Sequence, residues 1–133
     1  MKKEHYVVKG EVLFSGKGVA ETRYVSGKSE PTGREINKIA IKLSEKKLRD
    51  YDGLDNESTY TPKWVRGLSD DANFKSLYNI PVTNDGIDLD DIGKGSEVEI
   101  AFKVKEGCIY PLAVKVLNLV EKELINLNDL FES

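Results

Sequence analysis

The chain has 133 residues, 39% of them hydrophobic and 32% charged, a composition typical of one globular domain that can bury a core without disulfides. A single cysteine, Cys108, and a single histidine, His5, exclude a disulfide framework within the chain and a zinc site of the Cys/His type. The first residues lead into an alternating pattern and not into a continuous apolar stretch. We therefore expect no signal peptide, no membrane span and a cytoplasmic location.

The net charge of −3 is unevenly distributed. Residues 1–51 carry 12 Lys and Arg against 7 Asp and Glu, whereas residues 52–95 carry 4 against 9. A basic half on an acidic protein is compatible with a polyanion partner at one surface. Exposed lysines on strands are also ordinary solvating residues, so the charge does not identify that partner by itself.

The first predicted strand covers residues 5–19, because apolar side chains recur there at alternate positions. One set of alternate positions holds Tyr6, Val8, Val12 and Phe14. Gly10 inside this strand indicates a bulge or a tight bend. Residues 21–33 are rich in turn-forming residues, and we predict a mobile loop there.

The second predicted strand covers residues 34–43. Its inward set is Ile39, Ile41 and Leu43, and its outward set is Lys38, Ala40 and Lys42. Ser44–Arg49 is a candidate short helix, and residues 50–71 have no sustained period, so we predict a long connection. A third strand follows at residues 74–82, where Pro81 restricts it to a sheet edge or a strand end.

The last two predicted strands form a hairpin. Val98, Ile100, Phe102 and Val104 alternate with polar residues, and Gly107 then turns the chain. The return strand, residues 108–120, is apolar on both sets of positions, which predicts burial on both faces over part of its length and hence a barrel or closed sheet. We therefore predict an all-β domain over residues 1–120 and an acidic tail over residues 121–133.

Enzyme chemistry has little support in the sequence. His5 is the only histidine and stands near the start of the chain, and Gly16–Gly18 is too short for a phosphate-binding loop. Asp88, Asp90, Gly93 and Glu99 match four positions of a calcium loop. Ile92 occupies a ligand position of that loop, however, and its flanks are predicted strands where helices are required. A solvated acidic loop is the simpler interpretation.

Cations interleaved with aromatic residues favour binding to a single-stranded nucleic acid, because cations follow phosphates and exposed rings stack on bases. The residues with this pattern are Arg23, Tyr24, Lys28, Lys38, Lys42, Lys63, Trp64, Arg66, Lys75, Tyr78, Lys103 and Lys105. Trp64 lies between two cations in a segment without core periodicity, and we expect it to be exposed or to bind a ligand. For Phe74, Tyr78 and Tyr110 the alternative is a place in the core or in a cross-strand pair.

Three segments resemble parts of phage-encoded single-stranded DNA-binding proteins. They are residues 74–82 (FKSLYNIPV), 92–98 (IGKGSEV) and 112–117 (LAVKVL). In that family a lysine-serine-aromatic strand precedes a Gly-Ser-x-Val strand start, and the last strand has a similar apolar pattern. Five strands, a long loop between the first two and basic residues on the second also match a five-stranded OB-fold barrel.

The resemblance covers about residues 70–120 and implies a protein that protects single-stranded DNA in phage replication or recombination, in the host cytoplasm and without a cofactor. It also implies an acidic, aromatic tail that binds replication or recombination proteins. The tail residues concerned are Asp129, Leu130, Phe131 and Glu132.

We therefore expect sequence-independent binding of single-stranded DNA and no catalysis, with a groove over Lys38 and Lys42 and stacking from Tyr24, Trp64 and Tyr78. Two alternatives remain open: a protein-interaction adaptor or inhibitor, and a metal-dependent nuclease that uses Asp88, Asp90 and Glu99. The spacing of apolar residues in the tail favours a short helix. That tail could serve a partner protein, compete with DNA for the basic surface, pack on the barrel or form the seam of a homodimer.

Overall fold

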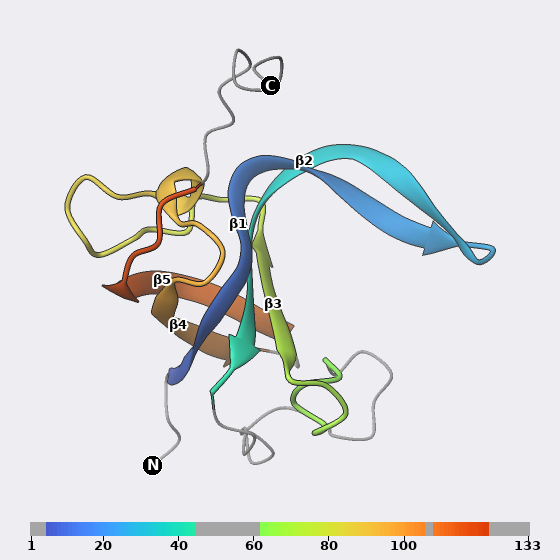
Figure 1. Ribbon diagram of the computed structural model, residues 1–133. Helices are drawn as coiled ribbons and strands as arrows, with labels where there is room; N and C mark the ends of the chain where they lie inside the picture. The colour runs from blue at the N-terminus through green and yellow to red at the C-terminus, as the bar shows by residue number, and fades with distance from the viewer. Residues whose placement is uncertain (1–4, 45–61, 106–107, 123–133) are drawn as a thin grey trace, which may run out of the picture.

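The computed structural model describes residues 5–44, 62–105 and 108–122 (Figure 1). Its strands form one antiparallel sheet in the order β3-β2-β1-β4-β5, which confirms the predicted all-β class. The elements are β1 (Tyr6–Val25), β2 (Lys28–Leu43), β3 (Asp71–Ser76), the 3₁₀ helix η1 (Leu89–Asp91), β4 (Glu97–Lys105) and β5 (Cys108–Asn118). The described part of the chain contains no helix with the length and apolarity needed to cross a membrane.

The sheet curls so that its two edge strands, β3 and β5, come close to each other. The chain just after β3 makes the contact: Val114 N donates to the Pro81 carbonyl at 2.9 Å, and Thr83 N donates to the Val114 carbonyl at 2.8 Å. Val82 and Val114 form an isolated parallel bridge. Among the described residues no ladder joins β3 to β5 directly, so the sheet is not closed as a barrel.

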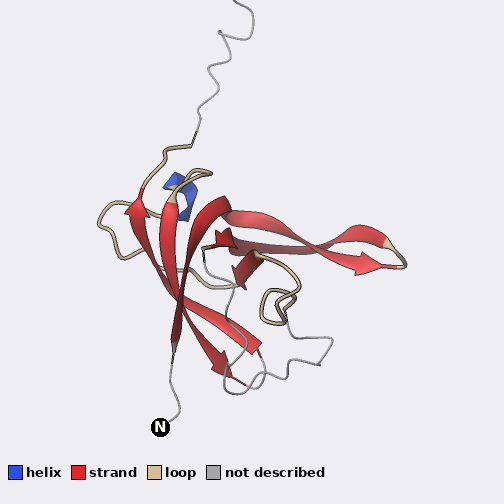
Figure 2. Cartoon of the chain, turned by 60° about the horizontal axis from the view of Figure 1, so that its bottom comes forward, coloured by secondary structure: helices blue, strands red, loops and turns tan. Residues whose placement is uncertain are grey.

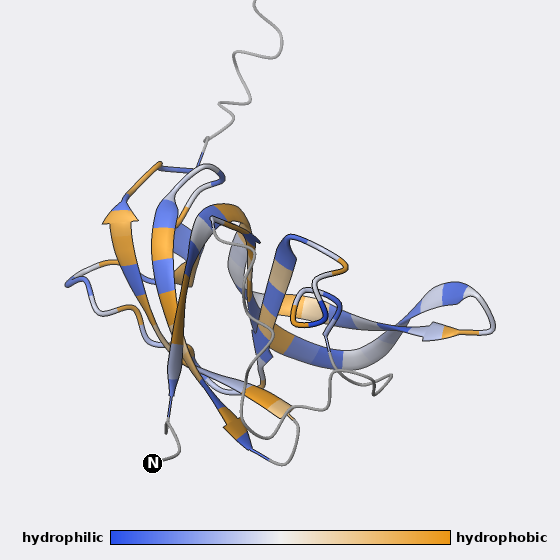
Figure 3. Ribbon diagram, turned by 90° about the horizontal axis from the view of Figure 1, so that it is seen from below, coloured by the Kyte–Doolittle hydropathy of each residue, from blue (hydrophilic) through white to orange (hydrophobic). Residues whose placement is uncertain are grey.

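The core lies inside the curl and contains the inward residues predicted from strand alternation. Ile39, Ile41, Val98, Ile100 and Phe102 all have 0% exposure. Rings gather at one end of this core, where the centroid of Phe102 lies 5.5 Å from that of Phe74 and 5.9 Å from that of Trp64. Figure 3 shows the resulting bands of alternating hydropathy along the strands of the sheet body.

The predicted loop at residues 21–33 is wrong. β1 and β2 continue through it as a two-stranded ribbon, defined here as residues 19–36, which projects from the sheet body (Figures 1 and 2). Ser26 and Gly27, with φ of 51° and 79°, form its turn, since a two-residue hairpin with positive φ at both positions matches the twist of the strands. The other turn-forming residues, Pro31 and Gly33, lie within β2 at an irregular stretch of the pairing.

The prediction that the last strand is buried on both faces is also wrong. Tyr110 and Leu112 are exposed, whereas Val114 and Val116, in the same set of alternate positions, are buried. A register shift separates the pairs Phe102–Pro111 and Ala101–Ala113. The inward-facing residues of β5 therefore have odd numbers before Leu112 and even numbers after it. The apolar residues on both sets therefore reflect a β-bulge and not burial on two faces.

One strand boundary and one outward-facing residue also differ from the predictions. β3 starts at Asp71 and ends at Ser76, because Leu77, Tyr78 and Asn79 turn out to the surface. The outward set of β2 includes Ala40, which is 7% exposed and thus buried. The candidate helix after Ser44 and the tail beyond residue 122 lie outside the described residues.

Candidate nucleic-acid interface

The outer surface of β2 and β3 carries two lysines directly opposite each other. Because Ile39 and Phe74 point into the core, their neighbours Lys38 and Lys75 point outward, and these two are register partners across the strand pair. Neither forms a salt bridge with a carboxylate among the described residues. Like charges directly opposite each other on a sheet destabilise it, so this pair is a local excess of positive charge, which the carboxylate of Glu21 offsets in part through its attraction to Lys75.

An exposed aromatic ring lies beside the lysine pair. The Nζ atom of Lys38 lies 5.8 Å from the ring centroid of Phe14, which is 44% exposed on β1. Partial burial first, and then the charge of Lys75, lower the pKa of Lys38. The sequence pattern places Phe14 in the same alternate set as Val12, but a register shift between the two turns the ring of Phe14 outward, whereas Val12 is buried.

A second ring borders this surface. Tyr78, 81% exposed, follows β3, and its backbone is fixed by Asn37, whose Nδ2 donates to the Tyr78 carbonyl at 2.7 Å. Asn37 is the neighbour of Lys38 on β2, so Tyr78 is held close to the lysine pair. We refer to Phe14, Lys38, Lys75 and Tyr78 as the basic face. Lys42, also predicted as a site residue, is exposed further along β2 and lies opposite Asp71.

Lys103 and Lys105 do not join the basic face. Both lie on β4, on the other side of β1, and Lys103 is paired with Tyr110 of β5. Along β1, the register partner of Lys38 is Gly16, whereas β4 reaches Phe102 opposite Tyr6. Ten residues of strand correspond to roughly 33 Å, so one nucleotide could not touch both groups.

Arg23, Tyr24 and Lys28 lie near the tip of the ribbon and do not join the basic face. Arg23 is seven residues along β1 from Gly16, the register partner of Lys38, and Lys28 is opposite Val25. Tyr24 is 80% exposed. Arg23 is opposite Glu30, and at the ribbon base Arg34 Nη2 lies 3.0 Å from Glu21 Oε1. The ribbon contains as many acidic as basic residues, and it therefore lacks the excess positive charge of the basic face.

Trp64 does not occupy the predicted exposed position. Its side chain is only 5% exposed and packs against Phe74, at 5.8 Å between ring centroids, and against Phe102. The short turn from Pro62 to Leu68 brings the ring into the core while Lys63 remains exposed and Arg66 is half-buried. The stabilisation gained by burying a large ring against two others outweighs the preference of its charged neighbours in sequence for solvent. Trp64 cannot stack on a base in this position.

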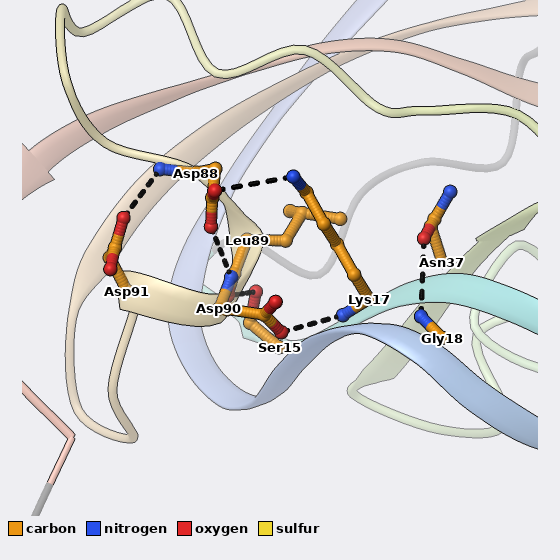
Figure 4. Close-up of polar contacts among 8 residues, drawn as sticks. All are labelled: Ser15, Lys17, Gly18, Asn37, Asp88, Leu89, Asp90 and Asp91. Atoms are coloured by element: carbon orange, nitrogen blue, oxygen red, sulfur yellow. Dashed lines mark hydrogen bonds and ion pairs between the residues drawn. The ribbon is translucent and has the colours of Figure 1, made fainter.

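The acidic segment around η1 is attached to β1 at the base of the ribbon (Figure 4). Ser15 Oγ donates to the Leu89 carbonyl at 2.7 Å, and Lys17 N donates to Asp90 Oδ1 at 2.8 Å. Lys17 Nζ also lies 3.2 Å from Asp88 Oδ2. The hydrogen bond from the backbone of Asp90, and then Lys17, lower the pKa of Asp88.

These contacts give the acidic residues a structural explanation. Asp88 caps η1 by accepting from Asp90 N, and the side chain of Asp91 accepts from Asp88 N. Glu99 lies between Lys9 and Lys115 in the sheet. No group of three His, Cys, Asp or Glu side chains among the described residues could hold a metal ion.

The structure describes every predicted site residue except the tail residues 129–132, which lie outside the described residues. The structure brings Lys38, Lys75 and Tyr78 together and adds Phe14 to them.

Comparison of the chain with protein-family models, curated proteins and solved structures finds no match.

Proposed function

We propose that the protein binds single-stranded DNA on the basic face, without sequence preference and without catalysis. The observation that carries the proposal is the opposed pair of Lys38 and Lys75, which forms no salt bridge with a carboxylate among the described residues and lies next to the exposed ring of Phe14. A phosphate placed over the pair would relieve the repulsion between the two ammonium groups. The ring beside it would offer a surface for a base.

Single strands suit this surface better than duplexes, because the faces of their bases are accessible to side chains. Phe14 and Tyr78 are both exposed beside the lysine pair, and each stacked base contributes about 1–3 kcal/mol. Every base has an aromatic face, so such stacking does not select a sequence.

The strand order supports the finer assignment to an OB-fold. β1 pairs with both β2 and β4, and the chain after β3 bridges to β5 in parallel. In OB-folds the surface of strands 2 and 3 is the common binding surface for oligonucleotides, and the basic face lies over these strands here. A role in phage replication or recombination, with a tail for protein partners, rests on the sequence resemblance described above.

Salt dependence tests the electrostatic part. The double variant Lys38→Gln/Lys75→Gln should bind oligo-dT more weakly, and the slope of log affinity against log salt should become less negative by about 0.7, the contribution of the one phosphate contact that the pair makes. Lys115→Gln is the matched control, because Lys115 is exposed on β5 opposite Glu99. An unchanged slope in the double variant, or equal affinity for duplex DNA, would reject the proposal.

Two equally exposed rings test the stacking part. Phe14 and Tyr110 are each 44% exposed, and a lysine amine lies 5.8 Å from the ring centroid of Phe14 and 6.0 Å from that of Tyr110. Phe14→Ala should weaken oligo-dT binding by about 1–3 kcal/mol, whereas Tyr110→Ala should leave it unchanged. The opposite result would move the site to β4 and β5.

One observation favours the alternative of a protein-interaction module. The apolar side chains of Leu112, Leu117, Leu119 and Val120 are each 37–39% exposed on or just after β5. Large exposed apolar patches are typical of protein contacts. If oligo-dT binding is absent and Leu117→Asp abolishes capture of a partner protein, this alternative replaces DNA binding.

A further inference from the structure

The ribbon has one free edge that is regular enough to pair with another strand. β4 pairs with β1 only from Tyr6 to Glu11, and among the described residues no strand neighbours β1 from Val19 to Val25 on the side away from β2. This stretch contains neither Gly nor Pro. A row of unpaired backbone groups on such an edge is a template for an additional strand.

The other edge of the ribbon is blunted. On β2 the same part of the ribbon contains Pro31, which has no N–H to donate, and Gly33, with φ of 83°. Between the pairs Ala20–Glu35 and Thr22–Pro31, three residues of β2 oppose one of β1, so β2 carries the bulge. Prolines and bulges are the features with which edge strands avoid unwanted pairing. The β1 edge of the ribbon carries neither.

We propose that the β1 edge, Val19–Val25, pairs antiparallel with the same edge of a second copy of the chain, around a two-fold axis at Thr22. In this register Glu21, whose carboxylate also lies 3.0 Å from Arg34 Nη2 of its own ribbon, lies opposite the Arg23 of the other copy, twice by symmetry. Ala20 lies opposite Tyr24. Val19 lies opposite Val25. Charges, sizes and apolar groups are therefore all self-complementary, as a two-fold interface between identical surfaces requires.

Neighbouring registers are unfavourable. Residues opposite each other in a continuous sheet share a face, so the axis must pass through a residue and not between two residues. An axis at Glu21 or at Arg23 would place two like charges directly opposite each other, which destabilises strand pairing. Beyond Val19 the edge is closed, because Lys17 N is bonded to Asp90. The pairing therefore has a defined register and a defined end.

A second copy suits this edge better than a nucleic acid does. The ribbon has balanced charges and hence no net attraction for phosphates. A two-stranded ribbon is marginally stable alone, and pairing two of them gives a four-stranded sheet. Since the ribbon projects from the sheet body, the body does not cover it (Figure 2). This inference does not depend on the proposed DNA binding.

Charge reversal with rescue by mixing tests the proposal. In the full chain, Glu21→Arg and Arg23→Glu should each weaken dimerisation by about tenfold or more in sedimentation velocity, because each places like charges opposite each other twice. An equimolar mixture of the two variants restores opposite charges at both positions and should dimerise again. Lys28→Glu, a charge reversal on β2 opposite Val25, is the matched control and should not change the dimer.

Restoration by mixing separates the proposal from a folding defect, which one variant could not repair in the other. A wild-type chain that is monomeric up to about 0.1 mM, or a mixture that stays monomeric, would overturn the proposal. Single variants that still form the dimer would overturn it as well.

Cysteine crosslinking tests the register. In a Cys108→Ser background, Thr22→Cys should form an intermolecular disulfide on oxidation, because residues facing their own copy on the axis have Cα atoms about 4.5–5.5 Å apart, within disulfide range. Ala20→Cys should not crosslink, since it faces Tyr24 and lies roughly 13 Å from its own copy. Crosslinking by Ala20→Cys and not by Thr22→Cys would reject this axis.

Discussion

β1 and β2 each have two halves with different environments. In the sheet body, Val8, Val12, Ile39 and Ile41 are at most 4% exposed, whereas in the ribbon Tyr24 is 80% exposed. The ribbon is mostly hydrophilic in Figure 3, while the body has alternating apolar bands. The same two strands thus rely on burial in one half and on cross-strand pairs and a tight turn in the other. A ribbon of this kind can keep its conformation while its surface is available to a partner.

The largest contrast between the halves should appear in the aromatic core. Phe102→Ala removes a ring that contacts Tyr6, Trp64 and Phe74 at centroid distances of 5.5–5.9 Å, and it should lower the free energy of unfolding by about 3–5 kcal/mol. Urea unfolding followed by the fluorescence of the single tryptophan measures this loss. Tyr24→Ala in the ribbon should change the free energy by less than about 0.5 kcal/mol. Equal losses would contradict the division into two halves.

A smaller effect is expected at Gly10, where the backbone of β1 packs against the backbone of β2. A Cβ atom on Gly10 would lie 2.4 Å from the Lys42 carbonyl oxygen, a backbone atom that cannot move aside, so Gly10→Ala should cost about 1–3 kcal/mol. In the ribbon, Gly27→Ala is strained only by its φ of 79°. It should fray the ribbon, seen by faster amide exchange there, and leave the urea transition of Trp64 unchanged. A shifted transition for Gly27→Ala would show that the two halves unfold together.

The contact that attaches η1 to the base of the ribbon should show a pH dependence. Asp88→Ala removes a helix cap and a partner of Lys17 and should cost about 1 kcal/mol at pH 7. Because the folded pKa of Asp88 is lowered, its contribution is present above the unfolded value of about 4 and is lost as the pH falls through the folded value. Urea unfolding at pH 7 and pH 3 measures the difference. Asp85→Ala, in the exposed turn before η1, should have little effect at either pH.

Alternation predicted the buried residues Ile39, Ile41, Val98, Ile100 and Phe102 well, because they lie on β2 and β4. At these positions the extra residue of each register shift belongs to the partner strand, β1 or β5, so the alternation of β2 and β4 is kept. It failed at the bulges. The shift after Val12 turns Phe14 outward, and the shift near Leu112 changes the inward set of β5. A bulge depends on how two distant strands pair, so a local pattern does not reveal it.

Other predictions failed for a related reason. A loop is predicted at residues 21–33 because turn-forming residues outnumber the β-formers Thr22, Tyr24 and Val25 there. Pairing with the partner strand, and not local composition, decides the conformation of this segment. The cations beside Trp64 suggested exposure, but the rings of Phe74 and Phe102 surround it. For the candidate site, alternation placed Lys38 on the outer surface, while its position opposite Lys75 depended on strand register.

The smallest effect on stability is expected from removal of the ribbon. Val19 and Ile36 are paired, so residues 20–35 can be replaced by Asn-Gly, which forms a two-residue hairpin turn. The free energy of unfolding should change by less than about 1 kcal/mol, because the aromatic core is untouched and the closed loop becomes shorter. Urea unfolding with Trp64 fluorescence measures it, and replacement of residues 23–30 by Asn-Gly, between the paired residues Thr22 and Pro31, gives an intermediate control. The basic face remains in both deletions, so affinity for a short oligo-dT should persist while the proposed dimer disappears. A deleted chain that no longer folds would instead mean that the ribbon stabilises the sheet body.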